Sequence, residues 1–328
     1  MKFGIFLTNQ STIGANPKTE FENQLDVVRR VRDFGFDSIW TGQHYLSTGI
    51  EMMQPLPFLS RIAPEVGNLK VGLGINLLAL HNPVEIAENY ASLDVICGGN
   101  LIFGVGLGYR DEEYAAFGLG KTGRVSRFEQ NLGALKSLWS ENDNEINLPW
   151  CYVKDARPSI RPIQKNLPIW MAANSDSAVQ RAARLADAWI INPHATFSTI
   201  ERQIELFRAS RVTPATEQPA IREVFCAETR EKAIKIARPF LLAKYSSYQS
   251  WGQHKALPGE ESFNIPFEDL LEDRFIVGSP SDCIKEFQRW VHLGVDHLLI
   301  RTHWFGMSTE DSTKSMELIA KFVIPALL

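Results

Sequence analysis

The sequence has few of the features that mark secreted, membrane-spanning or nucleic-acid-binding proteins. Its four cysteines are scattered and form no CxxC pair, which favours reduced structural thiols, with a single cysteine nucleophile as the alternative: Cys97, Cys151, Cys226 and Cys283. No apolar run approaches the roughly 20 residues that cross a bilayer. The formal charge of −4 comes without a basic stripe, which argues against nucleic acid as a partner. These absences predict a soluble cytoplasmic protein that acts without nucleic acid or membrane.

Motifs for metal and nucleophilic chemistry are also missing. The chain has no HExxH helix and no GxSxG nucleophile elbow, so we expect no metal site and no α/β-hydrolase chemistry. The run Gly104-Val105-Gly106-Leu107-Gly108 suggests a dinucleotide-binding loop, but it lacks the final glycine spacing and does not lead straight into a helix. Glycines at the mouth of a barrel explain it better. The remaining constellation of aromatic, glycine and phosphate-type residues indicates an organic cofactor.

Short β-rich runs alternate with longer helical patterns along the whole chain. This rhythm predicts parallel strands at residues 2–7, 38–43, 70–76, 101–108, 167–173, 188–192, 220–227 and 297–302. It predicts helices at residues 19–34, 57–66, 84–96, 124–139, 176–186, 197–212, 230–245 and 309–326. Eight such pairs in 328 residues predict an α/β fold, a closed (β/α)8 TIM barrel that forms one domain over residues 1–328. We expect residues 2–7 to be a strand and not a signal peptide.

Two stretches exceed this minimal plan. Residues 139–166 precede the fifth strand and contain three prolines, and residues 249–272 precede the eighth strand and contain Pro258, Gly259 and Pro266. Insertions of this length often form lids or binding loops. We expect the first to wrap over the surface and the second to be a lid.

Residues at the strand exits are the candidates for function, because a TIM barrel places its active site on the loops that leave the C-terminal ends of the strands. His44 follows the second strand, where it is either a proton donor or a loop histidine with a backbone partner. Gly72 and Gly74 alternate along the third strand, so they permit either the close approach of a flat ligand or packing against a large neighbour.

The fifth strand leads through Asn174 and Ser175 directly into the helix that begins at Asp176. The free amides of a first helical turn favour an anion, although Ser175 or Asp176 can simply cap the helix. Arg127, with Arg124 as a further candidate, is suited to pair with a phosphate there. The alternative for both arginines is a solvated helix face paired with glutamates such as Glu129.

The chain resembles the bacterial luciferase-like family of flavin-dependent monooxygenases and deazaflavin-dependent oxidoreductases. Each matching motif is short, and their order and spacing over nearly the whole chain carry the resemblance. The motifs are FGFDSIW at 34–40, QHY at 43–45, VGLG at 71–74, NPVEIAE at 82–88, LD at 93–94, GVGLG at 104–108, RFE at 127–129, LPIWMAA at 167–173 with RAARLADAW at 181–189, VGSP at 277–280 and GVDH at 294–297.

The resemblance implies a flavin at the C-terminal mouth of the barrel, supported by a non-prolyl cis peptide at Gly74–Ile75. It also implies His44 as the catalytic residue beside the ring. The implied cofactor-binding residues are Gly74, Ile75, Asn76, Gly106, Arg127, Asn174, Ser175, Asp176 and Ser177. Two departures stand out: Leu107 replaces an arginine that helps with phosphate in luciferase-type members, and Asn174 stands where the luciferases have an acidic residue.

The function implied first is a monooxygenase that takes reduced FMN from a separate reductase and uses oxygen to oxygenate a small organic substrate. A deazaflavin-dependent dehydrogenase or reductase is the alternative, and a non-catalytic flavin-binding protein is the second. We expect Phe6, Tyr109, His303 and Trp304 to line the substrate side, with loop packing as the alternative for the last two. We also predict a homodimer through the helix at 84–96 and the stretch at 52–66, although a helix that covers a barrel needs apolar residues as well.

Overall fold

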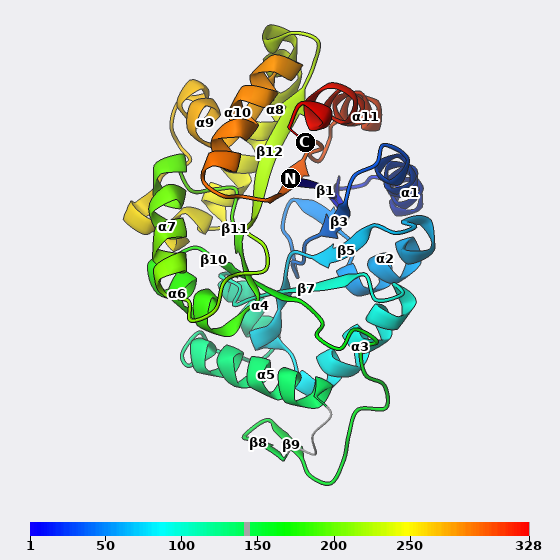
Figure 1. Cartoon of the computed structure of the whole chain (residues 1–328), viewed down its shortest axis with the longest axis vertical. Coiled ribbons are helices and arrows are strands. Elements are labelled where there is room, and N and C mark those ends of the chain that lie inside the picture. The colour runs from blue at the N-terminus through cyan, green and yellow to red at the C-terminus, as the bar shows by residue number, and fades with distance from the viewer. Residues whose placement is uncertain (141–144, 328) are drawn as a thin grey trace.

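Eight parallel strands close into a barrel, as the sequence predicts (Figure 1). The computed structural model describes residues 1–140 and 145–327. The barrel strands are β1 (Lys2–Phe6), β3 (Ser38–Thr41), β5 (Lys70–Leu73), β7 (Leu101–Gly106), β10 (Ile169–Ala173), β11 (Ala188–Ile191), β12 (Pro219–Cys226) and β14 (His297–Arg301). Closure comes from β7 pairing with β10 and from β1 pairing with β14. A closed sheet of this kind leaves no edge strand exposed.

A helix follows each barrel strand and covers the outside of the sheet. These helices are α1 (Pro17–Asp33), α2 (Pro55–Ile62), α3 (Pro83–Ile96), α5 (Arg124–Trp139), α6 (Asp176–Leu185), α7 (Phe197–Ala209), α8 (Arg230–Ser250) and α11 (Thr309–Leu318). Local signals fix their starts, since Asn16, Asn82 and Ser175 accept hydrogen bonds from first-turn amides. The last helix, α11, lies beside the first, α1 (Figure 1).

Large aromatic side chains fill the interior of the barrel. The rings of Trp40 and Trp170 stack with centroids 4.9 Å apart, and Nε1 of Trp40 donates to Oγ of Ser38 at 2.8 Å. A Cβ atom on Gly72 would lie 2.1 Å from the Trp40 ring. Packing against a large neighbour is therefore the reason for glycine at position 72, and of the two alternatives left open for it the packing one is right.

The first insertion holds a small hairpin of β8 (Ile146–Leu148) and β9 (Cys151–Val153), which lies beyond α5 and away from the barrel (Figure 1). Of the predicted surface stretch 139–166, residues 141–144 lie outside the described residues.

The second insertion is larger than the sequence predicts. After α8 it contains two short 3-10 turns at Gln253–Ala256 and Pro258–Glu260, then α9 (Phe267–Arg274), β13 (Phe275–Gly278) and α10 (Pro280–His292). The predicted plan omits β13, which has only four residues and pairs with the second half of β12. It also omits α10, although the capping box of Ser279 and Asp282 marks its start.

Several short elements surround the mouth of the barrel and are too short for a periodic sequence signal. They are β2 (Gln10–Thr12) paired with β4 (Ile50–Met52), β6 (Asn76–Leu77), α4 (Asp111–Ala116) and a 3-10 turn at Leu78–Leu80. A further 3-10 turn, Ala63–Glu65, continues the C-terminal end of α2. The predicted C-terminal helix ends early at Leu318 and continues as a π-helical segment, Ile319–Val323, and a 3-10 turn, Ile324–Ala326.

Within residues 1–140 and 145–327, no helix combines the length and apolar character that crossing a membrane requires. All four cysteines are unbridged and buried.

Candidate functional site

The loops that leave the C-terminal ends of the strands enclose a cavity of about 440 Å³. Residues after β1, β3, β5, β7, β10, β11 and β14 contribute to its walls, and the second insertion adds Gln253, Lys255 and Ala256. A cavity therefore lies at the barrel mouth, the position at which the sequence predicts the site.

Nine of the predicted site residues line this cavity. They are Phe6, His44, Gly74, Ile75, Gly106, Tyr109, Asn174, Ser175 and Trp304. The other five lie outside the lining: Asn76, Arg127, Asp176, Ser177 and His303. Asn76 is buried behind the wall, 3.5 Å from the hydroxyl of Tyr90. His303 places Nε2 3.0 Å from the Met307 carbonyl oxygen, and burial lowers its pKa.

The floor of the cavity carries the expected cis peptide at Gly74–Ile75. A Cβ on Gly74 would lie 2.7 Å from Cε2 of Phe6, and a Cβ on Gly106 would lie 2.0 Å from Cδ1 of Ile75. Side chains already occupy the space beside both glycines. Both glycines let large apolar side chains pack closely, and the result is a compact floor of Phe6 and Ile75.

His44 is held by a buried carboxylate that the sequence did not reveal. Its Nδ1 lies 3.0 Å from Oε1 of Glu113, which α4 supplies and which is fully buried. The backbone amide of Tyr45 donates to the same oxygen at 3.0 Å. A carboxylate accepts the Nδ1 proton, so Nε2 is left as a proton acceptor. His44 is therefore an oriented side chain and not a loop histidine with only a backbone partner.

The start of α6 forms one end of the cavity. Oγ of Ser175 caps the helix by accepting from the amide of Ala178 at 3.4 Å. The carboxylate of Asp176 turns away to Arg202, with bonds of 2.8 and 2.9 Å, and this pairing lowers its pKa. Ser177 has its hydroxyl 3.3 Å from that of Ser175.

Arg124, and not Arg127, is the arginine of α5 that lines the cavity. Nε of Arg127 donates to the Ala79 carbonyl at 2.8 Å, and its guanidinium lies 4.2 Å from the centre of the Trp150 ring. Nη1 of Arg124 is buried and has no hydrogen-bond partner. The glutamate suggested as a partner, Glu129, pairs instead with Arg181 at 2.7 Å. The unpartnered guanidinium edge of Arg124 is suited to an anionic ligand.

A buried charge cluster, two members of which line the cavity, was missed by sequence reasoning. Glu223 of β12 is fully buried and forms ion pairs with Lys244 of α8 and, at 2.8 Å, with Arg301 of β14. Its second oxygen accepts from Nε1 of Trp304 at 2.6 Å. Burial alone would raise the pKa of Glu223, but the charges of Lys244 and Arg301 lower it to about 2.

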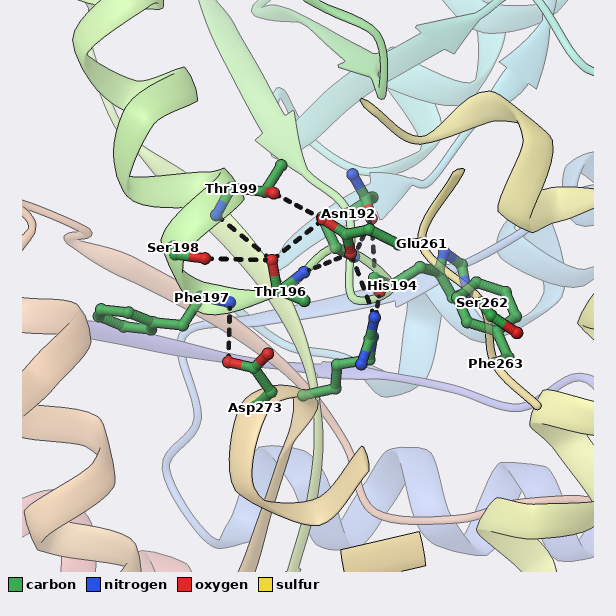
Figure 2. Close-up of polar contacts among 12 residues, drawn as sticks. Asn192, His194, Thr196, Phe197, Ser198, Thr199, Glu261, Ser262, Phe263 and Asp273 are labelled. Carbon is green, nitrogen blue, oxygen red and sulfur yellow. Dashed lines mark hydrogen bonds and ion pairs between the residues drawn. The ribbon is translucent and has the colours of Figure 1, made fainter. Parts of the chain in front are cut away.

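The second insertion is fastened to the loop after β11, as Figure 2 shows. Glu261 accepts from the amide of Thr196 at 2.8 Å and from its hydroxyl at 3.0 Å. Arg274 donates to the carbonyl of His194 at 2.7 Å and pairs with Glu261 at 3.2 Å. These contacts hold the predicted lid in place across one side of the cavity.

Among the described residues, no group of three or more His, Cys, Asp or Glu side chains is arranged to hold a metal ion. The features that select a ligand are the apolar floor of Phe6 and Ile75, the oriented His44 and the cationic side chains in the lining.

Comparison with known families shows to which family the chain belongs. The model of the luciferase-like monooxygenase family matches residues 1–297. The chain therefore belongs to this family of monooxygenases, which confirms the family and the oxidoreductase class predicted from the sequence. It is similar to the oxygenase component of the flavin-dependent trigonelline monooxygenase of Acinetobacter baylyi, with 22% identity over 99% of this chain and 95% of that protein.

Solved structures with the same fold use different cofactors. The oxygenating constituent of 3,6-diketocamphane monooxygenase from Pseudomonas putida, in complex with FMN, aligns with a TM-score of 0.82 and 16% identity over 99% of this chain and 98% of that one. An F420-dependent secondary alcohol dehydrogenase aligns with a TM-score of 0.78 and 16% identity over 100% of this chain and 99% of that one. At these identities the likeness establishes the fold.

Proposed function

We propose that the protein is the oxygenase component of a two-component monooxygenase, which binds reduced FMN delivered by a separate reductase and oxygenates a small organic substrate. The observation that carries the proposal is the arrangement at one end of the cavity. There the buried, unpartnered Nη1 of Arg124 and the start of α6 at Ser175 line the same space. Together they offer a cation and free amides to a phosphate.

The residues present fit FMN. The apolar floor of Phe6 and Ile75 suits a flat ring, and Asn174 offers polar atoms to a ring edge. Arg124 and Ser175, which line the cavity at the start of α6, would hold the phosphate. Gly74 and Gly106 would support the ring indirectly, through the close packing that they allow. In this assignment Arg127 and Asn76 do not touch the cofactor. They hydrogen-bond to residues behind the cavity wall, Arg127 to the carbonyl of Ala79 and Asn76 to the hydroxyl of Tyr90.

His44 is the proposed catalytic residue. Reduced flavin, when bound, would supply the electrons that activate oxygen. Nε2 of His44 can accept a proton from the substrate or return one to it, because Glu113 fixes the tautomer through Nδ1. The rings of Tyr109 and Trp251 lie 6.0 and 5.7 Å from the ring of His44, and this aromatic surface excludes water from the reacting groups.

The phosphate assignment is tested by binding FMN and riboflavin side by side. Arg124→Met should weaken FMN binding at least about tenfold, since a hydrogen bond to a charged group contributes about 1.5–3 kcal/mol. It should leave riboflavin binding unchanged, because riboflavin lacks the phosphate. Arg184→Met, an exposed arginine on α6, is the matched control and should bind both flavins like the wild type. Equal loss of FMN and riboflavin affinity would assign Arg124 to the ring or to the fold.

Deazaflavin dependence is the second candidate, and the F420-dependent enzyme that shares the fold is the observation in its favour. Photoreduced FMN and a reduced deazaflavin cofactor should be titrated into the protein under anaerobic conditions. Tighter binding of reduced FMN, followed by incorporation of labelled oxygen into a product, supports the oxygenase. Tight binding of the deazaflavin alone would overturn it.

The remaining partners are proposals of the same kind. We propose a cytoplasmic homodimer, because α3 exposes Val95 and Ile96 to solvent at 39% and 53% of their surface. Light scattering on the purified protein measures the mass directly. Charge substitution at Ile96 should yield monomers, and a dimer that persists would place the interface elsewhere.

A further inference from the structure

Positively charged side chains line the cavity. Among the described residues that form its walls, four carry positive charge, namely Arg124, Lys244, Lys255 and Arg301, and none is Asp or Glu. Arg124 belongs to the end assigned above to the phosphate of FMN. The other three lie on α8, the second insertion and β14.

The cluster of Glu223, Lys244 and Arg301 carries excess positive charge. Lys244 and Arg301 are both buried, with 5% and 8% of their surface exposed, and they share one carboxylate, that of Glu223. With Lys244 protonated, two cations and one anion leave a net charge of +1 in a place with little water. Buried charges are normally paired, so this arrangement calls for one further anion.

His194 adds an unpartnered donor to the same place. Its side chain is more than nine-tenths buried, lines the cavity and has no hydrogen-bond partner on Nε2. The amide nitrogen of Gln253 lies 3.4 Å from Nδ1 and donates to it, which puts the ring proton on Nε2. Burial and the nearby charge of Lys244 lower the pKa of His194, so the ring is a neutral N–H donor.

The cluster adjoins the floor on which the flavin ring is proposed to lie. The guanidinium of Arg301 lies 4.5 Å from the centre of the Phe6 ring, and Phe6 in turn fills the space beside Gly74. An anion at Arg301 would therefore stand next to the reacting part of the cavity.

We propose that Lys244, Arg301 and His194 form a subsite that binds the carboxylate of a monoanionic organic substrate. A carboxylate supplies the one missing negative charge, and its two oxygens match the paired N–H groups of an arginine. The apolar and aromatic lining, which includes Trp304, takes the organic part of the molecule. This inference rests on the proposed function, since it names the substrate class of that same cavity.

The test compares octanoate with octanamide, a neutral analogue of the same size. Calorimetric titration of the FMN-loaded wild type should show octanoate binding at least about tenfold more tightly. Arg301→Met and Lys244→Met should each abolish most of this preference. Each leaves Glu223 paired with the remaining cation, so the fold is kept. Arg184→Met is the exposed control and should keep the wild-type ratio.

Three results would overturn the subsite: no preference for octanoate in the wild type, a preference unchanged in both variants, or a preference lost only in Arg124→Met. Repeating the titrations without FMN separates the two proposals. Failure of FMN to bind contradicts the proposed cofactor, and the octanoate comparison in the flavin-free protein can still be read. Normal FMN binding without octanoate preference contradicts the subsite alone.

Discussion

Replacing Glu223 with glutamine tests directly how much the buried charge cluster contributes to stability. The carboxylate bonds to Lys244, Arg301 and Trp304, and no part of it reaches solvent. Glutamine keeps the size and the acceptor oxygen but removes the charge. Two buried cations would then face one another without an anion.

The expected loss of stability follows from these contacts. Removing one partner from a buried ion pair costs about 3–5 kcal/mol. An unfolding entropy of about 2.1 cal/mol/K per residue gives about 0.7 kcal/mol/K for 328 residues, so Tm should fall by about 4–7 °C. The matched control is Glu310→Gln, which removes an exposed carboxylate paired with Lys314 and should leave Tm unchanged.

The pH dependence provides a second signature. Burial and the charge of Arg301 lower the pKa of Lys244 to about 7, against 10.5 for a free lysine. Because the pKa of Lys244 is lower in the folded protein than in the unfolded chain, keeping this lysine charged lowers the free energy of unfolding. The loss is full below about pH 7 and fades as the pH rises towards 10.5. Without Glu223 this cost grows, so the Tm deficit of Glu223→Gln should be largest near pH 6 and smaller at pH 9. Calorimetric scans measure both. A deficit like that of Glu310→Gln, or one that grows with pH, would refute the reasoning.

Three further predictions concern other carboxylates. Glu113→Gln frees Nδ1 of His44 from its charged partner, so substrate-dependent oxygen uptake should show kcat lowered at least about tenfold with little change in KM; an equal rise in KM would indicate a binding role. Burial alone would raise the pKa of Glu217, but its hydrogen bond with His297 lowers it to about 2 from 4.5. Its stabilisation is present above pH 4.5 and lost as the pH falls towards 2, so Glu217→Gln should lower Tm clearly at pH 7 and little at pH 3, and equal losses at both values would contradict this. Glu261→Gln loosens the second insertion, so limited proteolysis there should speed up; an unchanged cleavage rate would show that Glu261 does not hold the lid.

The barrel and a cavity at its mouth were predictable from the sequence because both follow from local patterns. Alternating strand and helix periods define the barrel, and topology brings the strand exits to one mouth. His44 and Ser175 were found in this way. The arginine that we propose for the phosphate was harder to predict, since Arg124 and Arg127 lie three residues apart on one helix. The carbonyl of Ala79 and the ring of Trp150, which lie far from Arg127 in the sequence, hold its side chain in the wall.

The partners of the buried charges could not be predicted, because a charged residue in a sequence reads as a surface residue. Glu223 lies 21 positions from Lys244 and 78 positions from Arg301, so no sequence spacing connects them. Glu113 belongs to a helix of six residues, too short for a periodic signal. These groups are brought together only by closure of the barrel.

The charge of the cavity is opposite to that of the molecule. The chain carries a formal charge of −4, yet the cavity wall holds four cations and, among the described residues, no carboxylate. A single anion would need only one cationic end. Two anions in one cavity repel each other, and this repulsion is offset when each anion lies beside its own cation. Arg124 at one end and the pair of Lys244 and Arg301 at the other provide that separation, as a flavin phosphate and a substrate carboxylate require.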